Sequence, residues 1–347
     1  MMYIMKISDF TYDLPDELIA KHPPRVRGTS RLLVLDRQTN HIFDQKYVDI
    51  LDLLNPGDLL VLNDTKVIKS RIMTTKTNGA KRELILLERH GSDTNWHRHQ
   101  ALHRGSLKSG DILTVHVPDS SKNPPIIVVD EVLGGGISIV SSSTDLLKLA
   151  DRCGTPPLPP YMRRQASQAD IERYQTIFAN KIGSAAAPTA SLNMTSELMS
   201  KLEKKGVIIK YLTLHVGLGT FLPIRADNVE DHHMHSEYYE IPDDTIAAVK
   251  SVKRSGRRVV ALGTTVARTL ECYAHTNKTA GEADIFIYPG YHFDLVDALL
   301  TNFHAPNSTV LMLASAFAGW ENLQLAYTLA VAKKYQFLSY GDSMFIS

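Results

Sequence analysis

The chain has 347 residues, of which 44% are hydrophobic and 22% are charged, and its formal net charge is +1 at pH 7. This length predicts about two domains with enough apolar mass for a buried core. The composition is that of an ordinary globular protein. The charge excludes a strongly basic chain and taken alone argues mildly against RNA binding, although local basic patches can lie on a neutral whole.

Two features indicate the compartment. Cys153 and Cys272 are the only cysteines and lie in no metal-ligand spacing, which favours a reduced intracellular chain. The N-terminus has no charged region followed by an apolar stretch, and the longest apolar run, near Val310 to Trp320, is too short to span a bilayer. We therefore expect a cytoplasmic protein without a membrane partner.

The first predicted elements are strands. Apolar runs at 31–36 and 58–64 predict strands of a well-buried sheet. Between about residues 67 and 141 the pattern changes, because short strand-like segments are separated by Gly, Ser, Asn and Asp clusters without a long helix. This rhythm predicts a small all-β barrel or sandwich. Its expected strands are 83–88, 111–117, 126–132 and 137–140.

A short helical stretch at 145–150 and a stiff proline-rich connector at 156–160 follow the strands. Beyond the connector, helices and strands alternate. We predict a large mixed α/β domain made of residues 1–66 and 155–347, with a small all-β barrel domain inserted at 67–154. The expected helices are one that runs to 205 (with Thr195 and Ser196 as N-cap candidates and Gly206 ending it), 243–255, 264–274, 308–317 and 322–334, and the expected strands are 207–215, 257–262, 284–288 and 336–340.

One segment of small residues and one segment with two glycines are candidate ligand sites. Small residues at 183–190 leave backbone N–H groups accessible to an anion or a polar ligand edge, although a tight packed loop is an equal alternative. The segment 213–223 begins as a strand and turns at Gly217 and Gly219. It lacks the third glycine of a dinucleotide-binding fingerprint, because that position is Leu222.

The segment 231–237 allows two interpretations. If it is a strand, His233, His235 and Glu237 share one face and resemble a zinc-binding set, which would indicate a metal-dependent hydrolase. No helical His-x-x-x-His pair or similar spacing is present. We therefore favour polar contacts to a substrate and expect no metal.

Later segments place polar side chains at the ends of elements. Gly263 leads into Thr264 and Thr265 at a helix N-terminus, which favours a carboxylate or phosphate, although ordinary N-capping is the alternative. Turns at 288–293, 301–306 and 339–342 carry aromatic and polar residues. Aromatic side chains there can stack on a purine or deazapurine ring.

Together these segments resemble the S-adenosylmethionine:tRNA ribosyltransferase-isomerase family of queuosine biosynthesis along nearly the whole chain. So many blocks in one order are specific, whereas each alone would be weak. The matching blocks are 8–10 with 14–15, 30–36, 56–65, 157–161, 172–175, 183–190, 213–221, 235–237, 263–265, 289–291, 301–304, 315–319 and 339–342.

The chain departs from the family pattern at two places. After Ala190 the family usually reads Gly-Leu-His-Phe-Thr, whereas Ser191, Asn193 and Met194 stand here in place of Gly, His and Phe. The insert also matches poorly around 97–107. A divergent non-catalytic protein that binds tRNA or a nucleoside is therefore an alternative, and a methyltransferase that uses the same donor is a third.

The resemblance implies a large α/β domain with a small inserted β-barrel. It also implies transfer and isomerisation of the ribosyl part of S-adenosylmethionine onto 7-aminomethyl-7-deazaguanine at the wobble position of tRNA. The products are epoxyqueuosine in tRNA, adenine and methionine. S-adenosylmethionine is then a consumed co-substrate, and we expect no cofactor, no metal and no obligate protein partner.

The resemblance also fixes the expected site residues. His215, His235 and His304 are the expected titratable groups, and Glu237 or Asp342 would orient them or hold an ammonium group. The other expected substrate contacts are Asn63, Thr65, Ser184, Pro188, Thr189, Gly217, Gly219, Thr220, Phe221, Gly263, Thr264, Thr265, Arg268, Tyr291, Asn302 and Tyr340. Candidate tRNA-contacting clusters, each also interpretable as a solvated face, are Lys21 with Arg25, Arg27 and Arg31; Arg163 with Arg164; and Lys250 with Lys253, Arg254, Arg257 and Arg258.

Overall fold

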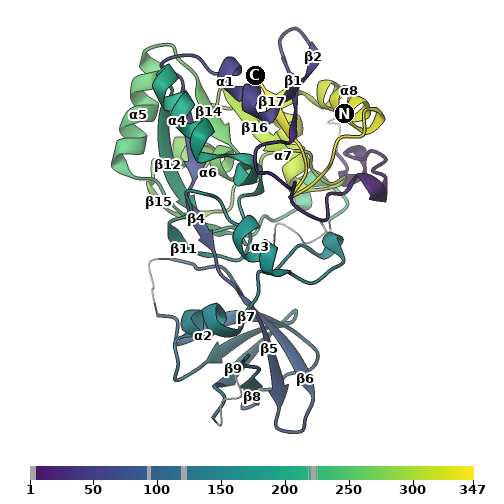
Figure 1. The fold of residues 1–347 in the computed structure, drawn as a ribbon, viewed down its shortest axis with the longest axis vertical. Coiled ribbons are helices and arrows are strands. Elements are labelled where there is room, and N and C mark those ends of the chain that lie inside the picture. The colour runs from purple at the N-terminus through teal and green to yellow at the C-terminus, as the bar shows by residue number, and fades with distance from the viewer. Residues whose placement is uncertain (1–4, 92–94, 119–122, 218, 220–223, 225) are drawn as a thin grey trace.

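The computed structural model describes residues 5–91, 95–118, 123–217, 219, 224 and 226–347. A large α/β domain lies above a smaller β-barrel in Figure 1. The predicted fold class, a mixed α/β domain with an inserted barrel, is confirmed. Within the described ranges, no helix is long and apolar enough to cross a membrane.

A nine-stranded mixed sheet forms the centre of the α/β domain. Its inner strands pair in parallel, whereas the edges and one inner pair are antiparallel. The strand order is β15 (Ala280–Ala283), β13 (Glu237–Glu240), β12 (Ile208–Leu214), β3 (Leu59–Asn63), β14 (Val259–Leu262), β16 (Ala298–Asn302), β17 (Ser343–Ile346), β1 (Arg31–Leu35) and β2 (Ile42–Lys46).

Helices cover both faces of this sheet, which explains why its central strands are apolar without alternation. Leu59 and Val61 of β3 belong to one buried cluster, and Leu60 and Leu62 of the same strand belong to another. The helices of the domain are α1 (Ile50–Leu53), α3 (Gln168–Arg173), α4 (Ser196–Lys205), α5 (Asp243–Arg254), α6 (Thr264–Thr276), α7 (Thr309–Ala318) and α8 (Trp320–Ala332).

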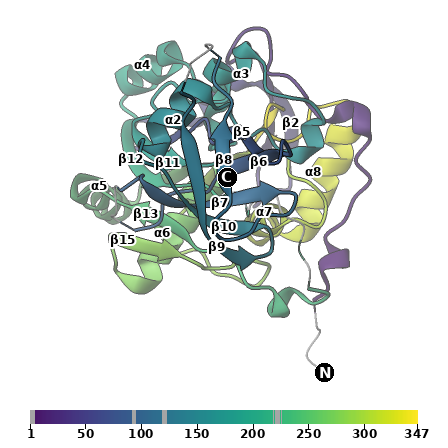
Figure 2. The same ribbon diagram turned by 90° about the horizontal axis from the view of Figure 1, so that it is seen from below.

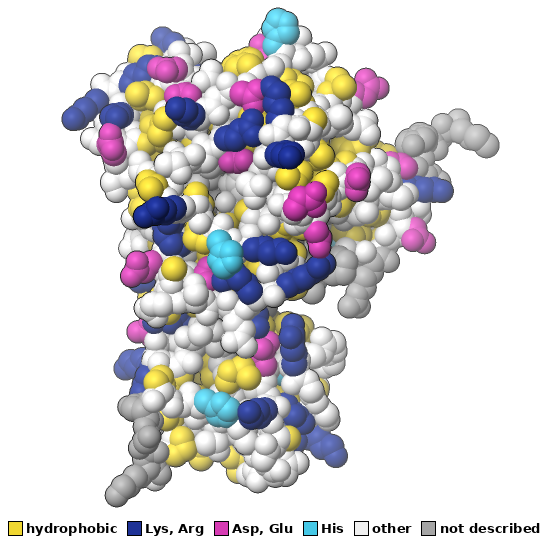
Figure 3. Space-filling view, turned by 45° about the vertical axis from the view of Figure 1, so that its right-hand side comes forward, with side chains coloured by type: hydrophobic (Ala, Val, Ile, Leu, Met, Phe, Trp, Pro, Cys, Tyr) yellow, Lys and Arg dark blue, Asp and Glu magenta, His cyan; other side chains and the backbone are white. Residues whose placement is uncertain are grey.

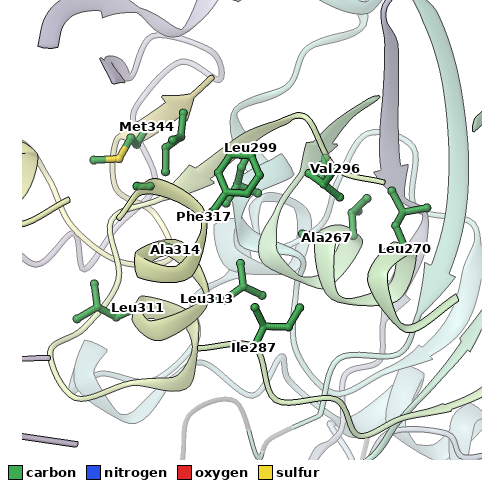
Figure 4. Packing of buried hydrophobic residues seen from close by; sticks show 14 of the residues in the cluster. Ala267, Leu270, Ile287, Val296, Leu299, Leu311, Leu313, Ala314, Phe317 and Met344 are labelled. Carbon is green, nitrogen blue, oxygen red and sulfur yellow. The ribbon is translucent and has the colours of Figure 1, made fainter. Parts of the chain in front are cut away.

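The larger of the two cores holds the helices that border the candidate site. Figure 4 shows Ala267 and Leu270 of α6 near Leu313 and Phe317 of α7, with Leu299 of β16 behind them. All five side chains are at least 95% buried. Helices α6 and α7 are therefore fixed firmly against the sheet, and their first turns have defined positions.

The N-termini of the helices differ in how they are capped. The Thr195 hydroxyl accepts a hydrogen bond from Leu198 N at 3.1 Å and so caps α4, as predicted. Ser308 caps α7 in the same way, by accepting from Leu311 N at 3.2 Å. Helix α6 follows Gly263, which has φ +100° and offers no side-chain cap. The first N–H groups of α6 are therefore left for another acceptor.

The insert is a closed antiparallel barrel that carries its own core. Helix α2 (Leu146–Cys153) packs against it through Leu146, Leu149 and Ala150. The strand order around the barrel is β10 (Ile137–Ser141), β7 (Arg98–Arg104), β6 (Lys81–Leu86), β5 (Arg71–Lys76), β8 (Ile112–Val115) and β9 (Ile126–Gly134).

Two neighbouring stretches of chain connect the barrel to the α/β domain. β4 (Thr65–Val67) pairs in parallel with β11 (Lys181–Ser184), and Arg71 exchanges backbone hydrogen bonds with Thr155. Figure 2, seen from below, shows the barrel in front of the α/β domain. The outgoing and returning chain therefore leave the large domain side by side.

Two predicted strands are wrong. Residues 284–288 and 336–340 are not strands, and the neighbouring strands are β15 and β17 instead. Ile287 and Phe337 are buried in the large core, so these segments are apolar because their side chains pack while their backbones form loops. Periodicity and burial alone do not separate such a loop from a strand.

Candidate active site

A cavity of about 920 Å³ lies where several strands of the large sheet end. It is bounded by the ends of β14 and β16 and by the segment that follows β12, where open α/β sheets usually bind ligands. Three predicted ligand segments, at 183–190, 263–265 and 301–306, meet in its wall. The lining residues that were predicted are Pro188, Thr189, Gly263, Thr264, Thr265, Asn302 and His304.

A narrower pocket of about 70 Å³ adjoins this cavity. The two share Ile224, Thr264, Thr265 and Val310 as lining residues. The narrow pocket is otherwise lined by apolar side chains, mostly from 285–287 and α7, and by the polar side chains of His232, His235, Glu237, Arg268 and Thr309. Its predicted site residues are Gly219, His235, Glu237, Thr264, Thr265 and Arg268.

His304 lies in the wall of the wide cavity and is held at three points. Its Nε2 is 3.0 Å from Thr301 Oγ1, its backbone N–H donates to the Tyr327 hydroxyl at 2.9 Å, and its carbonyl accepts from the Tyr12 hydroxyl. Burial lowers the pKa of the His304 imidazole to about 3. The ring is therefore neutral at pH 7 and can accept a proton.

Thr189 and Asn302 join two walls of the cavity. The Thr189 hydroxyl donates to Asn302 Oδ1 at 2.9 Å, and Asn302 Nδ2 donates to the Asp342 carbonyl at 3.4 Å. Thr189 starts a short 3-10 helix, η5 (Thr189–Asn193), and Asn302 ends β16. This link fixes the small-residue segment against the sheet.

Glu237 and Arg268 form a buried ion pair at the narrow pocket. Glu237 is 3% exposed and Arg268 is 8% exposed. The second carboxylate oxygen, Glu237 Oε1, accepts a hydrogen bond from Gly217 N at 2.6 Å. Burial lowers the pKa of the Arg268 guanidinium to about 10, so that this side chain remains cationic at pH 7.

His215 does not line either pocket. Its Nδ1 is 2.8 Å from Thr65 Oγ1, and its ring packs so closely on Gly183 that a Cβ built there would lie 2.7 Å from Nε2. Burial lowers the pKa of His215 to about 4. The buried contacts of His215 and Thr65 therefore join β4, β11 and the end of β12.

Two further predicted residues hold strand ends together behind the cavity. Asn63 Oδ1 accepts from Leu214 N at 3.1 Å and its Nδ2 donates to the Leu214 carbonyl at 3.0 Å, which joins β3 to β12. The Ser184 hydroxyl accepts from Val216 N at 2.7 Å and donates to the Ala186 carbonyl at 2.7 Å. Both side chains are fully buried.

The remaining predicted residues lie elsewhere. Asp342 accepts from Arg31 N and Gln336 N, and Tyr340 donates to Asp170 Oδ1 at 2.8 Å. The Tyr291 hydroxyl is 2.7 Å from His275 Nε2. Neither these three residues nor Gly217 line the two pockets. Thr220 and Phe221 lie outside the described residues.

The three departures from the family pattern lie behind the cavity wall. Asn193 Nδ2 donates to the Gly341 carbonyl at 3.3 Å, and Met194 packs in the second core with Leu198 and Leu202. Ser191 is fully buried. None of the three lines either pocket, although Ala190 beside them does.

The metal-site alternative rests on a strand that starts too late to support it. β13 begins only at Glu237, so period-two alternation does not place His233 and His235 on its face. The Glu237 carboxylate is also occupied by Arg268. In the described part of the chain, no group of three or more His, Cys, Asp and Glu side chains is placed to hold a metal ion.

Several cavity residues were not predicted. Lys6, Ile7, Tyr161 and Asp227 line the wide cavity, and Phe286 lines the narrow pocket. Ile7 and Tyr161 lie in the short 3-10 helices η1 (Ile7–Asp9) and η4 (Pro160–Met162), and the other three lie outside the named helices and strands. Their place at the site depends on tertiary packing, so only the resemblance blocks beside Ser8 and Tyr161 pointed to these regions.

Two of the three predicted basic clusters lie together near the cavity. Arg164 Nε donates to the Lys21 carbonyl at 2.7 Å, and Arg164 also pairs with Asp170. Tyr161, three residues earlier, lines the cavity. Figure 3 shows several Lys and Arg side chains above the waist between the α/β domain and the barrel. In the third cluster, Arg258 pairs with Asp58 instead.

Comparison with known proteins identifies the family. The family described as queuosine biosynthesis protein matches residues 7–346. The chain belongs to this family. It is 51% identical to a protein of Chlorobium phaeobacteroides over 99% of this chain and 100% of that protein, and 48% identical to one of Geobacter sulfurreducens with the same coverage. Both are named S-adenosylmethionine:tRNA ribosyltransferase-isomerase.

A solved structure agrees with this assignment. The crystal structure of an S-adenosylmethionine tRNA ribosyltransferase from Thermotoga maritima is 35% identical in sequence and has a TM-score of 0.57. The match covers 98% of this chain and 100% of that chain. Both the barrel and the α/β domain of this queuosine biosynthesis family member therefore have counterparts in the family.

Proposed function

We propose that this chain is an S-adenosylmethionine:tRNA ribosyltransferase-isomerase. It transfers and isomerises the ribosyl part of S-adenosylmethionine onto 7-aminomethyl-7-deazaguanine at the wobble position of tRNA. The products are epoxyqueuosine-tRNA, adenine and methionine. S-adenosylmethionine is consumed as a co-substrate, and no metal or redox cofactor takes part.

The wide cavity at the strand ends is the observation that supports this proposal most. The full-length relatives of the chain are named S-adenosylmethionine:tRNA ribosyltransferase-isomerase. The cavity volume of about 920 Å³ lies near the upper end of the roughly 300–1,000 Å³ usual for small-molecule sites. This leaves room for a nucleoside donor together with an acceptor base. A flipped base also needs such a recess, because chemistry on a base requires its removal from the stack.

The chemistry requires a base near the donor ribose. The sulfonium acidifies the adjacent ribose carbon, and a neutral imidazole there can take the proton that starts the rearrangement. His304 is the candidate for this role, because it lines the cavity and burial keeps its ring neutral at pH 7. Thr301 holds one ring nitrogen, which orients the ring and leaves the other facing away from that contact.

His235 is the second of the predicted histidines that line the combined site. It lines the narrow pocket beside Gly219, where a Cβ built on the glycine would lie 2.5 Å from His235 Cδ2. We assign His235 to contact with the donor and His215 to positioning of the strand ends. The non-catalytic alternative gains no support, because Ser191, Asn193 and Met194 do not line the pockets.

The proposal is tested by turnover with defined substrates. Purified protein is mixed with S-adenosylmethionine and a tRNA that carries 7-aminomethyl-7-deazaguanine, and free adenine and methionine are measured by chromatography. Both should appear in equal amounts and only with the modified tRNA. Release of S-adenosylhomocysteine instead would indicate a methyltransferase, and binding of the tRNA without adenine release would indicate a non-catalytic protein.

A further inference from the structure

The ion pair of Glu237 and Arg268 is unusual because both partners are buried at a pocket wall. Glu237 is 3% exposed and Arg268 is 8% exposed, and both line the narrow pocket. Burying two charges costs desolvation energy that their mutual attraction does not always recover. A pair in this position therefore calls for a role besides stability.

Arg268 retains unused hydrogen-bond donors. Its Nη2 faces Glu237 Oε2, while its buried Nε has no hydrogen-bond partner within the described ranges. A guanidinium carries five N–H donors in a planar fork that matches a carboxylate. The side chain can therefore hold a second anion without giving up Glu237.

The start of α6 supplies further donors at the same place. Thr264 and Thr265 line the narrow pocket, and Gly263 before them provides no side-chain cap. The first N–H groups of this 13-residue helix thus favour an anion. Arg268 is four residues after Thr264 and so lies on the same helix face, one turn further on.

The rest of the narrow pocket's wall combines apolar side chains with Gly219, His232, His235 and Thr309. Met234, Ile285, Phe286, Ile287 and Leu313 surround a volume of about 70 Å³. The cationic Arg268 and the anionic Glu237 lie side by side next to these apolar side chains. This arrangement matches a zwitterionic amino-acid group at the end of an apolar chain. A phosphodiester fits poorly, because Glu237 would repel its oxygens and it carries no ammonium group to pair with that carboxylate.

We propose that the narrow pocket binds the amino-acid end of S-adenosylmethionine. Arg268 and the first N–H groups of α6 hold the α-carboxylate, and Glu237 holds the α-ammonium. The ribose then lies at Thr264 and Thr265, between the two pockets, and the adenine and the tRNA base share the wide cavity with His304. This assignment rests on the proposed function and specifies how its donor is oriented.

The test compares ligands that differ only in the carboxylate. S-adenosylhomocysteine and its decarboxylated counterpart are titrated into the full chain by calorimetry, with and without saturating tRNA that carries the aminomethyl base. Neither ligand is a sulfonium, so neither turns over. The unmodified protein should prefer the carboxylate by roughly 10- to 100-fold, as expected for a charge-assisted hydrogen bond.

Two substitutions localise the preference. In the Arg268→Met variant, the ratio of the affinities for the two ligands should fall close to one. The affinity for the decarboxylated ligand should stay within about threefold of that of the unmodified protein. Arg268→Lys, which keeps the charge but not the fork, should retain part of the preference. Arg258→Met is the matched control. Arg258 forms an ion pair with the buried Asp58 at 2.6 Å, and neither residue lines the two pockets. The control should keep the full preference.

Each contrary result has its own meaning. Equal binding of both ligands by the unmodified protein overturns the carboxylate subsite and leaves the proposed function standing. An equal loss of affinity for both ligands in both Arg268 variants overturns the role of Arg268. Failure of the unmodified protein to bind either ligand, with or without tRNA, overturns the subsite, and release of adenine and methionine from S-adenosylmethionine then decides the proposed function separately.

Discussion

His304 is the residue on which the proposed chemistry depends most. Replacement of His304 by Ala should lower the rate of adenine release by about 10²–10⁴-fold, the range usual for loss of a general acid or base. The protein should still fold, because the ring's only hydrogen bond among the residues that the structure describes is the one to Thr301. His292→Ala, at an exposed histidine paired with Asp294, is the control and should be fully active. Near-normal turnover of the His304 variant would remove this assignment.

The protonation state of His304 gives a separate prediction. Because burial lowers its pKa to about 3, the imidazole should stay neutral well below the ordinary histidine pKa of about 6.5. Titration of His304 should therefore cause no loss of activity near pH 6.5 in the profile of kcat/KM against pH. A histidine titration by NMR with a midpoint near 6.5, assigned to His304, would contradict the proposed environment of this ring.

Individual residues also show the limit of sequence reasoning. The resemblance blocks contained both His215 and His304, and sequence alone gave no reason to separate them. The structure places His304 in the cavity wall and His215 against Thr65 and Gly183, outside it. The difference depends on how the ends of β12 and β16 pack, and no local pattern encodes it.

At the scale of elements, the barrel and the α/β domain approach each other closely at Gly217. A Cβ at this position would lie 2.3 Å from Oε1 of Glu88, which follows β6 of the barrel and is 8% exposed. Gly217→Ala should therefore lower the free energy of unfolding by about 1–3 kcal/mol through overpacking. Adding Glu88→Ala should relieve much of that loss, measured as a double-mutant cycle in urea unfolding. Additive losses would contradict the close approach of these two residues.

His90 makes the same junction dependent on pH. Its Nε2 is 3.6 Å from Glu88 Oε1 and its Nδ1 is 3.1 Å from Glu282 Oε2, on β15. The nearby carboxylates of Glu88 and then Glu282 raise the pKa of His90 to about 9. The folded-state pKa is thus above the unfolded value, so the stabilisation is fully present below about pH 6.5 and is lost as pH rises through 9.

Unfolding of the unmodified protein and of His90→Gln should therefore be compared across this pH range. The difference in their free energies of unfolding should be largest at the acidic end and vanish above pH 9. His116→Gln is the control, because this exposed histidine follows β8, bonds to Thr75 of the barrel, and has no partner in the α/β domain among the described residues. A difference for His90→Gln that does not change with pH would exclude the charged interaction.

Elements were predicted best where one physical signal dominates. The continuous apolar run of β3 follows from burial on both faces, and the turn-rich rhythm of the insert gave the barrel. The segments 284–288 and 336–340 failed because their apolar side chains serve the core from loops. In the second segment, Leu338 has φ +70° and Gly341 N bonds to its carbonyl, which closes a turn in place of a strand.

For the whole molecule, the proposed function requires a tRNA surface next to the cavity. Lys21 and Arg25 are exposed, and the Lys21 carbonyl is held by Arg164 near the cavity residue Tyr161. Changing Lys21 and Arg25 to Glu should weaken tRNA binding. The slope of log affinity against log salt should also fall by about 1 for each tRNA phosphate that the variant no longer neutralises.

A matched control lies on another surface. Lys250 and Arg254 on α5 are also exposed, and neither lines the cavity. Changing this pair to Glu alters the net charge equally and should leave the salt slope nearly unchanged. An equal effect of both double substitutions would indicate a general charge effect in place of a defined tRNA surface.

The most direct test of the central claim follows the ribose carbons. S-adenosylmethionine labelled with ¹³C only in its ribose is incubated with the protein and the aminomethyl-deazaguanine tRNA, and the digested tRNA is analysed by mass spectrometry. We predict that every labelled carbon enters the modified nucleoside while adenine and methionine are released unlabelled. Label that stays in a small molecule, or a methyl group in the tRNA without the ribose carbons, would contradict the proposed reaction.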